Sequence, residues 1–144
     1  MATVVRRLYY EGRPGLKQVK EEWFEVGGIR EGPYRKYYPS GTLCQTGSYL
    51  HGKQHGEVRA YYQGDGTADG PIYMICTLVN GLREGEHTIF YMSGQVQKRS
   101  HYKDNVMVGT YELYTPDGIP IVPDERRVVM RTNMLAGNFE PFNL

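Results

Sequence analysis

A segment of ten or eleven residues occurs four times along this chain, and this recurrence restricts the available folds more than any other feature. Each copy begins at a glycine, carries aromatic residues near its middle and ends in a turn containing a second glycine. The starting glycines are Gly32, Gly56, Gly85 and Gly109, so the steps are 24, 29 and 24 residues. Periods of this length are typical of repeat proteins, in which each unit packs against its neighbours.

Turn signals divide each unit into two runs of six to eight residues rich in Tyr, Thr, Val and Ile. The expected turns lie at residues 39–41, 92–94 and 116–118 and around Gly52 and Asn105. Gly and Asn adopt positive φ at low cost, as tight hairpin turns require. Gly or Pro also recurs too often for a stable helix inside the repeats. The sequence therefore predicts an all-β fold, an open, elongated antiparallel sheet of consecutive β-hairpins.

The repeats define the domain organisation. A weaker early unit can be traced through Tyr9-Tyr10 and Gly28–Gly32, so we expect the β-hairpin repeat domain to span residues 1–122. The second unit contains five extra residues, placed by their Gly and Asp content in a loop at 64–71. Residues 123–144 should form a C-terminal cap and an extended tail. Within this part, residues 124–137 fit either a short capped helix, which we favour, or a strand.

Two aromatic positions recur, counted here as the fifth and sixth residues after each starting glycine. The fifth-position aromatics are Tyr37, Tyr61, Phe90 and Tyr114, and the sixth-position tyrosines are Tyr38, Tyr62 and Tyr91. Because neighbouring strand residues face opposite ways, the two sets should lie on opposite faces of the sheet. We expect the fifth-position set to line one continuous face as a stacking core. The sixth-position tyrosines, together with Phe139 and Phe142 of the tail, are then candidate interaction residues.

The charge and the cysteine content indicate which classes of partner and which cellular compartment to expect. The formal net charge is +1, with 17 Lys and Arg against 16 Asp and Glu spread along the chain. Such a balance argues against direct nucleic-acid binding and against binding to anionic membrane lipid. Two cysteines are too few for a disulfide framework, and no apolar stretch has the length of a membrane span. We therefore expect a soluble, cytoplasmic protein.

No motif in the chain predicts catalysis, a metal ion or a cofactor. His51 and His55 are spaced as metal ligands would be on a helix, but they flank a predicted turn. Asp65 and Asp69 lack the alternating ligands of a calcium loop. The sequence also lacks a phosphate-binding loop and a serine nucleophile motif. We expect a non-enzymatic protein with no catalytic residues, no metal and no cofactor.

The order Gly-x4-Tyr-Tyr-x2-Gly, followed by Gly-x-Tyr-x2-Gly-x3-Gly, resembles the MORN repeat. The fixed positions of this pattern are Gly32, Tyr37, Tyr38, Gly41, Gly47, Tyr49, Gly52 and Gly56. The similarity is to the bacterial and viral variant often described as an antitoxin component. The chain departs from the pattern where Val58 and His87 replace an aromatic residue and where Asn105 replaces Gly.

The resemblance implies a structural, protein–protein interaction module, a scaffold or an assembly component, including one of a virion or another large complex. Protein partners, a homo-oligomer or a larger assembly would follow from it, as would a location in the virion if the protein is viral. Two alternatives stay open at this stage: an antitoxin-like inhibitor that binds one toxin, and a membrane-associated adaptor.

Overall fold

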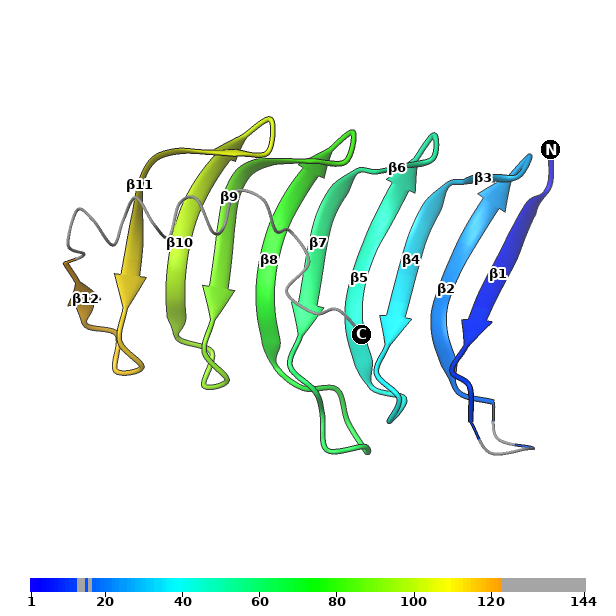
Figure 1. The fold of residues 1–144 in the computed structure, drawn as a ribbon, viewed down its shortest axis with the longest axis horizontal. Coiled ribbons are helices and arrows are strands. Elements are labelled where there is room, and N and C mark those ends of the chain that lie inside the picture. Colours follow the sequence, from blue (N-terminus) through cyan, green and yellow to red (C-terminus); the bar gives the residue numbers. More distant parts are fainter. Residues whose placement is uncertain (13–14, 16, 123–144) are drawn as a thin grey trace.

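The computed structural model describes residues 1–12, 15 and 17–122, and in this part twelve strands form one antiparallel sheet (Figure 1). The strands are β1 (Thr3–Tyr9), β2 (Val19–Val26), β3 (Ile29–Arg30), β4 (Gly32–Tyr37), β5 (Leu43–Leu50), β6 (Lys53–Gln54), β7 (Gly56–Tyr61), β8 (Ile72–Val79), β9 (Leu82–Phe90), β10 (Val96–Lys103), β11 (Val106–Tyr114) and β12 (Pro120–Ile121).

The sheet is a simple meander in which each strand pairs with its neighbours in sequence. Its order is β1-β2-β4-β5-β7-β8-β9-β10-β11-β12, and the two-residue strands β3 and β6 pair with β2 and β5. The predicted open antiparallel sheet of consecutive hairpins is confirmed. The weaker early unit is part of it, as the hairpin β1–β2. The helix or strand expected at 124–137 lies outside the described residues.

Two-residue turns join the strands at one end of the sheet, the upper end in Figure 1. Both residues of every such turn have positive φ: Gly27-Gly28 (59° and 81°), His51-Gly52 (51° and 85°), Asn80-Gly81 (51° and 82°) and Asp104-Asn105 (48° and 69°). Positive φ at both positions defines the type I′ turn, whose twist matches that of paired strands. Gly52 and Asn105 therefore occupy equivalent places, as their spacing predicts.

Longer turns close the hairpins at the opposite end. In three of them the glycine amide returns to the backbone of its own unit: Gly41 N donates to Tyr38 O, Gly94 N to Tyr91 O and Gly118 N to Thr115 O, each at 2.9 Å. These are the turns predicted at residues 39–41, 92–94 and 116–118. The five extra residues of the second unit enlarge the turn between β7 and β8 into a loop (Figure 1).

Side chains alternate between two faces of the sheet, one buried and one exposed. The inner face is the one that carries Trp23, Tyr34, Val58, Ala60, Met74, Cys76, Leu78, His87, Ser100, Tyr102, Met107, Tyr111 and Leu113, all buried. The strand register aligns them in rows, for example Val58 opposite Cys76 and His87 opposite Ser100. The outer face carries Arg7, Glu22, Arg35, Arg59, Ile75, Thr88, Arg99 and Glu112 in a parallel row.

Long cationic side chains cover part of the inner face. The Arg30 guanidinium lies 4.1 Å from the centre of the Trp23 ring, and the Arg83 guanidinium lies 4.2 Å from that of Tyr102. Cations in this position are attracted to the ring face, while their aliphatic stems cover apolar surface. Rings also lie flat on the backbone: a Cβ at Gly47 would be 2.5 Å from the Tyr34 ring. This close approach requires glycine at position 47.

The fifth-position aromatics share one face, but that face is not the core. Phe90 and its equivalents are half-buried on the outer face, in phase with Arg59 and Glu112. The core positions are instead the second residues after the starting glycines: Tyr34, Val58, His87 and Tyr111. The expectation of a fifth-position core is wrong because both strand phases carry aromatic residues. Aromatic content alone could not indicate which phase faces inward.

The positive φ of Asn80 gives a stability prediction. Alanine is strained in the left-handed region by about 1–2 kcal/mol, whereas glycine is not. Asn80→Ala should lower the free energy of unfolding by about this amount, and Asn80→Gly should lower it little or not at all. Urea denaturation of the two variants checks the difference. Equal stabilities would contradict the type I′ geometry.

Candidate interaction surface

The sixth-position tyrosines and Tyr10, their equivalent in the early unit, connect each repeat to the next. Each hydroxyl donates to the backbone carbonyl of the fifth-position aromatic one unit further along the chain. The bonds are Tyr10 to Tyr37 O (2.6 Å), Tyr38 to Tyr61 O (2.6 Å), Tyr62 to Phe90 O (2.7 Å) and Tyr91 to Tyr114 O (2.7 Å). We call these four bonds the tyrosine ladder. Sequence spacing identified the residues but gave no sign of where their hydroxyls bind.

The tyrosine ladder changes what these side chains can offer a partner. Tyr38 is 4% exposed, and burial raises the pKa of its phenol well above the usual value. Tyr62 is half-buried, and burial raises its pKa as well. Their hydroxyl protons are already donated within the sheet, so these hydroxyls have no proton left to donate to a partner. Binding by Tyr38, Tyr62 and Tyr91 stays a prediction, and Phe139 and Phe142 lie outside the described residues.

A second set of hydrogen bonds links the repeats at the type I′ turns. The amide of the second turn residue donates to a backbone carbonyl of the preceding unit. The bonds are Gly52 N to Arg30 O (3.0 Å), Gly81 N to Gln54 O (2.7 Å) and Asn105 N to Arg83 O (3.0 Å). We call these three bonds the turn ladder. The step between hairpins is thus fixed at both ends of the strands.

Two loop residues expected to be simple turn formers also make defined contacts. Asp65 accepts hydrogen bonds from the Thr67 hydroxyl (2.6 Å) and from the amides of Thr67 (2.8 Å) and Ala68 (3.2 Å), and these bonds lower the pKa of its carboxyl. Asp69 accepts one from the Leu43 amide at 2.8 Å and so fastens the enlarged loop to the preceding hairpin. Neither carboxylate is arranged as a calcium ligand set would require.

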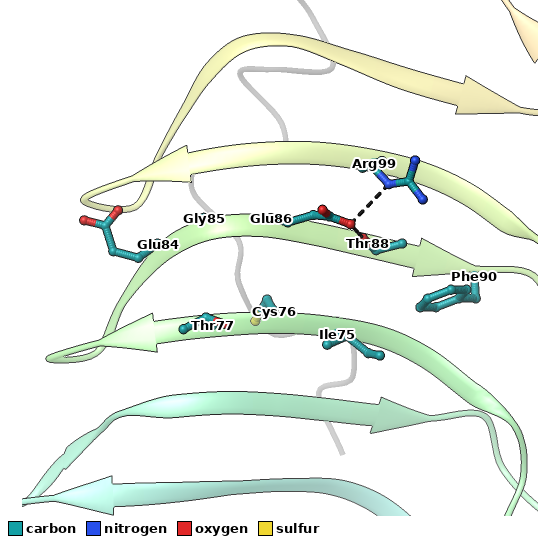
Figure 2. Close-up of a pocket in the computed structure, with 9 residues that line it drawn as sticks. All are labelled: Ile75, Cys76, Thr77, Glu84, Gly85, Glu86, Thr88, Phe90 and Arg99. Carbon is teal, nitrogen blue, oxygen red and sulfur yellow. Dashed lines mark hydrogen bonds and ion pairs between the residues drawn. The ribbon is translucent and has the colours of Figure 1, made fainter.

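A hollow on the outer face lies over β8, β9 and β10 and has a volume of about 550 Å³ (Figure 2). Ile75 and Phe90 provide its apolar surface, and Thr88, on the same strand as Phe90, lies directly opposite Ile75. Arg99 is held beside them by carboxylates on both sides: Nε lies 3.1 Å from Glu86 and Nη1 lies 3.4 Å from Glu112. The hollow therefore combines a fixed apolar patch with a positioned guanidinium.

Burial keeps His87 and Cys76 of the inner face uncharged near pH 7. His87 is buried, and burial together with Arg83 and Lys98 lowers its pKa to about 4, so the ring is neutral near pH 7. Burial raises the pKa of the Cys76 thiol to about 12, which removes the thiolate needed for nucleophilic attack. Cys44 and Cys76 are both free and buried. These groups suit packing more than catalysis.

The two histidines with ligand-like spacing have separate contacts. His51 Nδ1 lies 2.8 Å from a Glu31 oxygen, and His55 Nδ1 accepts from the Asn80 amide at 3.4 Å. Across residues 1–12, 15 and 17–122, no three His, Cys, Asp or Glu side chains gather in a way that could hold a metal ion. The same residues contain no helix of the length and apolarity needed to cross a membrane.

The fold and its two ladders define an open repeat protein built from hairpins. Residues 30–51 and 83–104 match the family model of the MORN repeat variant. Both segments begin at a turn-ladder acceptor, Arg30 or Arg83, and end at the first residue of a type I′ turn, so they cover the same structural unit. The chain thus carries repeats of the MORN variant type, as the sequence predicts. No curated protein and no solved structure matches it.

Removing one hydroxyl tests the tyrosine ladder. Tyr38→Phe leaves the Tyr61 carbonyl without its donor in a largely buried place, which should cost about 1–3 kcal/mol of unfolding free energy. Tyr37→Phe, the same change on the outer face of the same unit, is the matched control and should cost less than about 0.5 kcal/mol. Chemical denaturation measures both. A Tyr38→Phe variant as stable as its control would show that the bond contributes nothing.

The low pKa of His87 predicts acid sensitivity. The native state binds fewer protons than the unfolded chain, whose histidine pKa is near 6.5, so stability is complete above pH 6.5 and falls as pH drops toward 4. The loss attributable to His87 should approach about 3 kcal/mol. His87→Gln should be less stable near pH 7, but its free energy of unfolding should change less between pH 6.5 and 4. Denaturation across that range provides the measurement, and parallel profiles for the two proteins would refute the assignment.

Proposed function

We propose that this chain is a non-enzymatic protein–protein interaction module that acts as a scaffold or assembly component. The observation that carries the proposal is the outer-face hollow, in which Ile75 and Phe90 lie beside the fixed Arg99. Apolar and aromatic centres with a positioned arginine and a polar rim are typical of binding hot spots in protein interfaces. Repeats of the MORN type generally serve in contacts with proteins or membranes and are typically non-catalytic.

Rigidity supports this proposal. The hollow is built on strands whose relative positions are fixed by pairing and by the turn and tyrosine ladders. A preformed surface loses less conformational entropy on binding than a flexible one does. Arg99 already lies between Glu86 and Glu112, so its guanidinium need not be ordered by the partner.

An antitoxin-like inhibitor is the second candidate, and it would use the same surface for a single toxin partner. A membrane-associated adaptor is less well supported, because the formal net charge is only +1 and the outer-face arginines Arg7 and Arg99 are paired with carboxylates. A cytoplasmic location, or the virion for a viral protein, fits a chain whose two described thiols are free and buried.

Matched outer-face variants test the proposal. Phe90→Ala with Arg99→Ala removes the aromatic and the guanidinium of the hollow, while Arg35→Ala with Tyr37→Ala removes one aromatic and one guanidinium from the outer face two units earlier. Both pairs are at most half-buried, so both proteins should fold. Proteins that co-purify from the native source with the wild-type chain are identified by mass spectrometry, and their affinities are then measured by calorimetry.

The proposal expects a partner that loses affinity by about tenfold or more with the first variant and keeps it with the second. Equal binding to both variants would exclude the hollow as the binding surface. One stoichiometric partner whose toxicity the chain neutralises would favour the antitoxin alternative. Retention on anionic vesicles but on no protein would favour the membrane alternative.

A further inference from the structure

Strand β1 leaves an open pairing edge at the start of the sheet (Figure 1). It pairs with β2 along its whole length, and in the described part of the chain no strand lies on its other side. All seven residues, Thr3–Tyr9, are exposed, including Val4 at 43% and Leu8 at 49%. The strand contains no proline. Its pairing with β2 is regular from Thr3 to Leu8 and shifts between Leu8 and Tyr9. A long and partly apolar edge of this kind is a template for another strand.

The opposite edge is covered only in part. There β12 pairs with Leu113 and Tyr114 of β11, has two residues and begins with Pro120, which cannot donate a backbone hydrogen bond. Thr115 occupies the sixth position of the last unit, where a tyrosine would reach forward to another repeat. Its hydroxyl accepts from the Ile119 amide at 3.1 Å within its own turn. This end therefore cannot extend the tyrosine ladder, which argues against head-to-tail stacking of copies.

Charge does not protect the β1 edge either. Arg6 Nε lies 3.4 Å from a Glu25 oxygen, and Arg7 Nε lies 2.7 Å from a Glu22 oxygen. Charged residues usually keep edge strands apart, but here each arginine is paired with a carboxylate of its own sheet. The edge thus has backbone groups, apolar side chains and little net charge to offer a second strand.

We propose that β1 pairs antiparallel with β1 of a second copy, with Arg6 of each chain opposite Arg6 of the other. This register uses all seven residues. It also keeps the inner face continuous, because inner-face residues of one copy lie opposite inner-face residues of the other. It places Val4 opposite Leu8 of the second copy twice, and it lets each Arg6 reach the Glu25 of either chain. The two sheets then form one continuous sheet around a two-fold axis. This surface is separate from the outer-face hollow, so the inference does not rest on the proposed function.

Sedimentation velocity of the full chain over a wide concentration range tests the dimer. The wild-type chain should sediment as a dimer that dissociates on dilution. Val4→Lys with Leu8→Lys places the lysine at position 4 of each copy opposite the lysine at position 8 of the other. The repulsion should weaken dimerisation by about a hundredfold or more. Ile119→Lys with Ile121→Lys makes the same change at the other edge and should leave the dimer intact. Thermal melting at low concentration shows that both variants fold.

A single engineered cysteine tests the register. Residues directly opposite in an antiparallel pair have Cα atoms about 4.5–5.5 Å apart, within disulfide range. Arg6→Cys should therefore form a covalent dimer under mild oxidation, whereas Thr3→Cys, opposite Tyr9 of the second copy, should not. Cys44 and Cys76 are buried and should not interfere.

Three results would overturn the inference. One is a wild-type chain that stays monomeric at every concentration, for instance because another segment of the chain occupies the β1 edge. Another is a dimer that Ile119→Lys with Ile121→Lys dissociates and the β1 variant does not. The last is cross-linking at Thr3→Cys but not at Arg6→Cys, which would exclude the proposed register.

Discussion

The hydrogen bonds that leave the strand ladder and join one hairpin to the next determine how this sheet is built. Ordinary strand pairing allows a hairpin to slip along its neighbour by two residues without exchanging its faces. The turn ladder and the tyrosine ladder remove that freedom, because each is anchored to a particular backbone carbonyl of the neighbouring unit. Both ladders continue past the enlarged loop of the second unit, because its extra residues project beyond the sheet (Figure 1).

The side-chain packing of the inner face depends on this fixed offset between neighbouring hairpins. The rings and guanidinium groups of this face need particular neighbours on the adjacent strands. Tyr34 lies over Gly47, and Arg83 lies over Tyr102, only because the strands carrying them are held in register. A slip of two residues would bring the Tyr34 ring against a residue with a side chain. The outer face, free of this packing requirement, can then carry the charged row and the hollow proposed for binding.

Much of the architecture could be predicted from the sequence, because glycine and asparagine report backbone conformation directly. The hairpins, the turns at 39–41, 92–94 and 116–118 and the equivalence of Gly52 with Asn105 all follow from positive φ and a regular step. The fifth-position aromatics were assigned to the wrong face because tyrosine suits either side of a half-buried sheet. The burial of Arg83 and the neutral state of His87 depend on neighbours from other strands, which a linear pattern does not reveal.

The candidate site was less predictable than the fold for the same reason. The hollow joins Ile75, Phe90 and Arg99 from three strands, and only the register brings them together. The sixth-position tyrosines were conspicuous in the sequence, yet their hydroxyls serve the step between repeats. A repeated residue can thus mark a structural contact between units as readily as a surface for partners.

Native-state amide hydrogen exchange tests the fixed step most directly. The second residue of a two-residue turn normally points its amide toward water and exchanges quickly. Here the amides of Gly52, Gly81 and Asn105 donate to the preceding unit, so they should be protected to the same degree as the amides of the strands beside them. Exchange of these three amides at rates typical of unfolded peptides, with the strand amides still protected, would contradict the account.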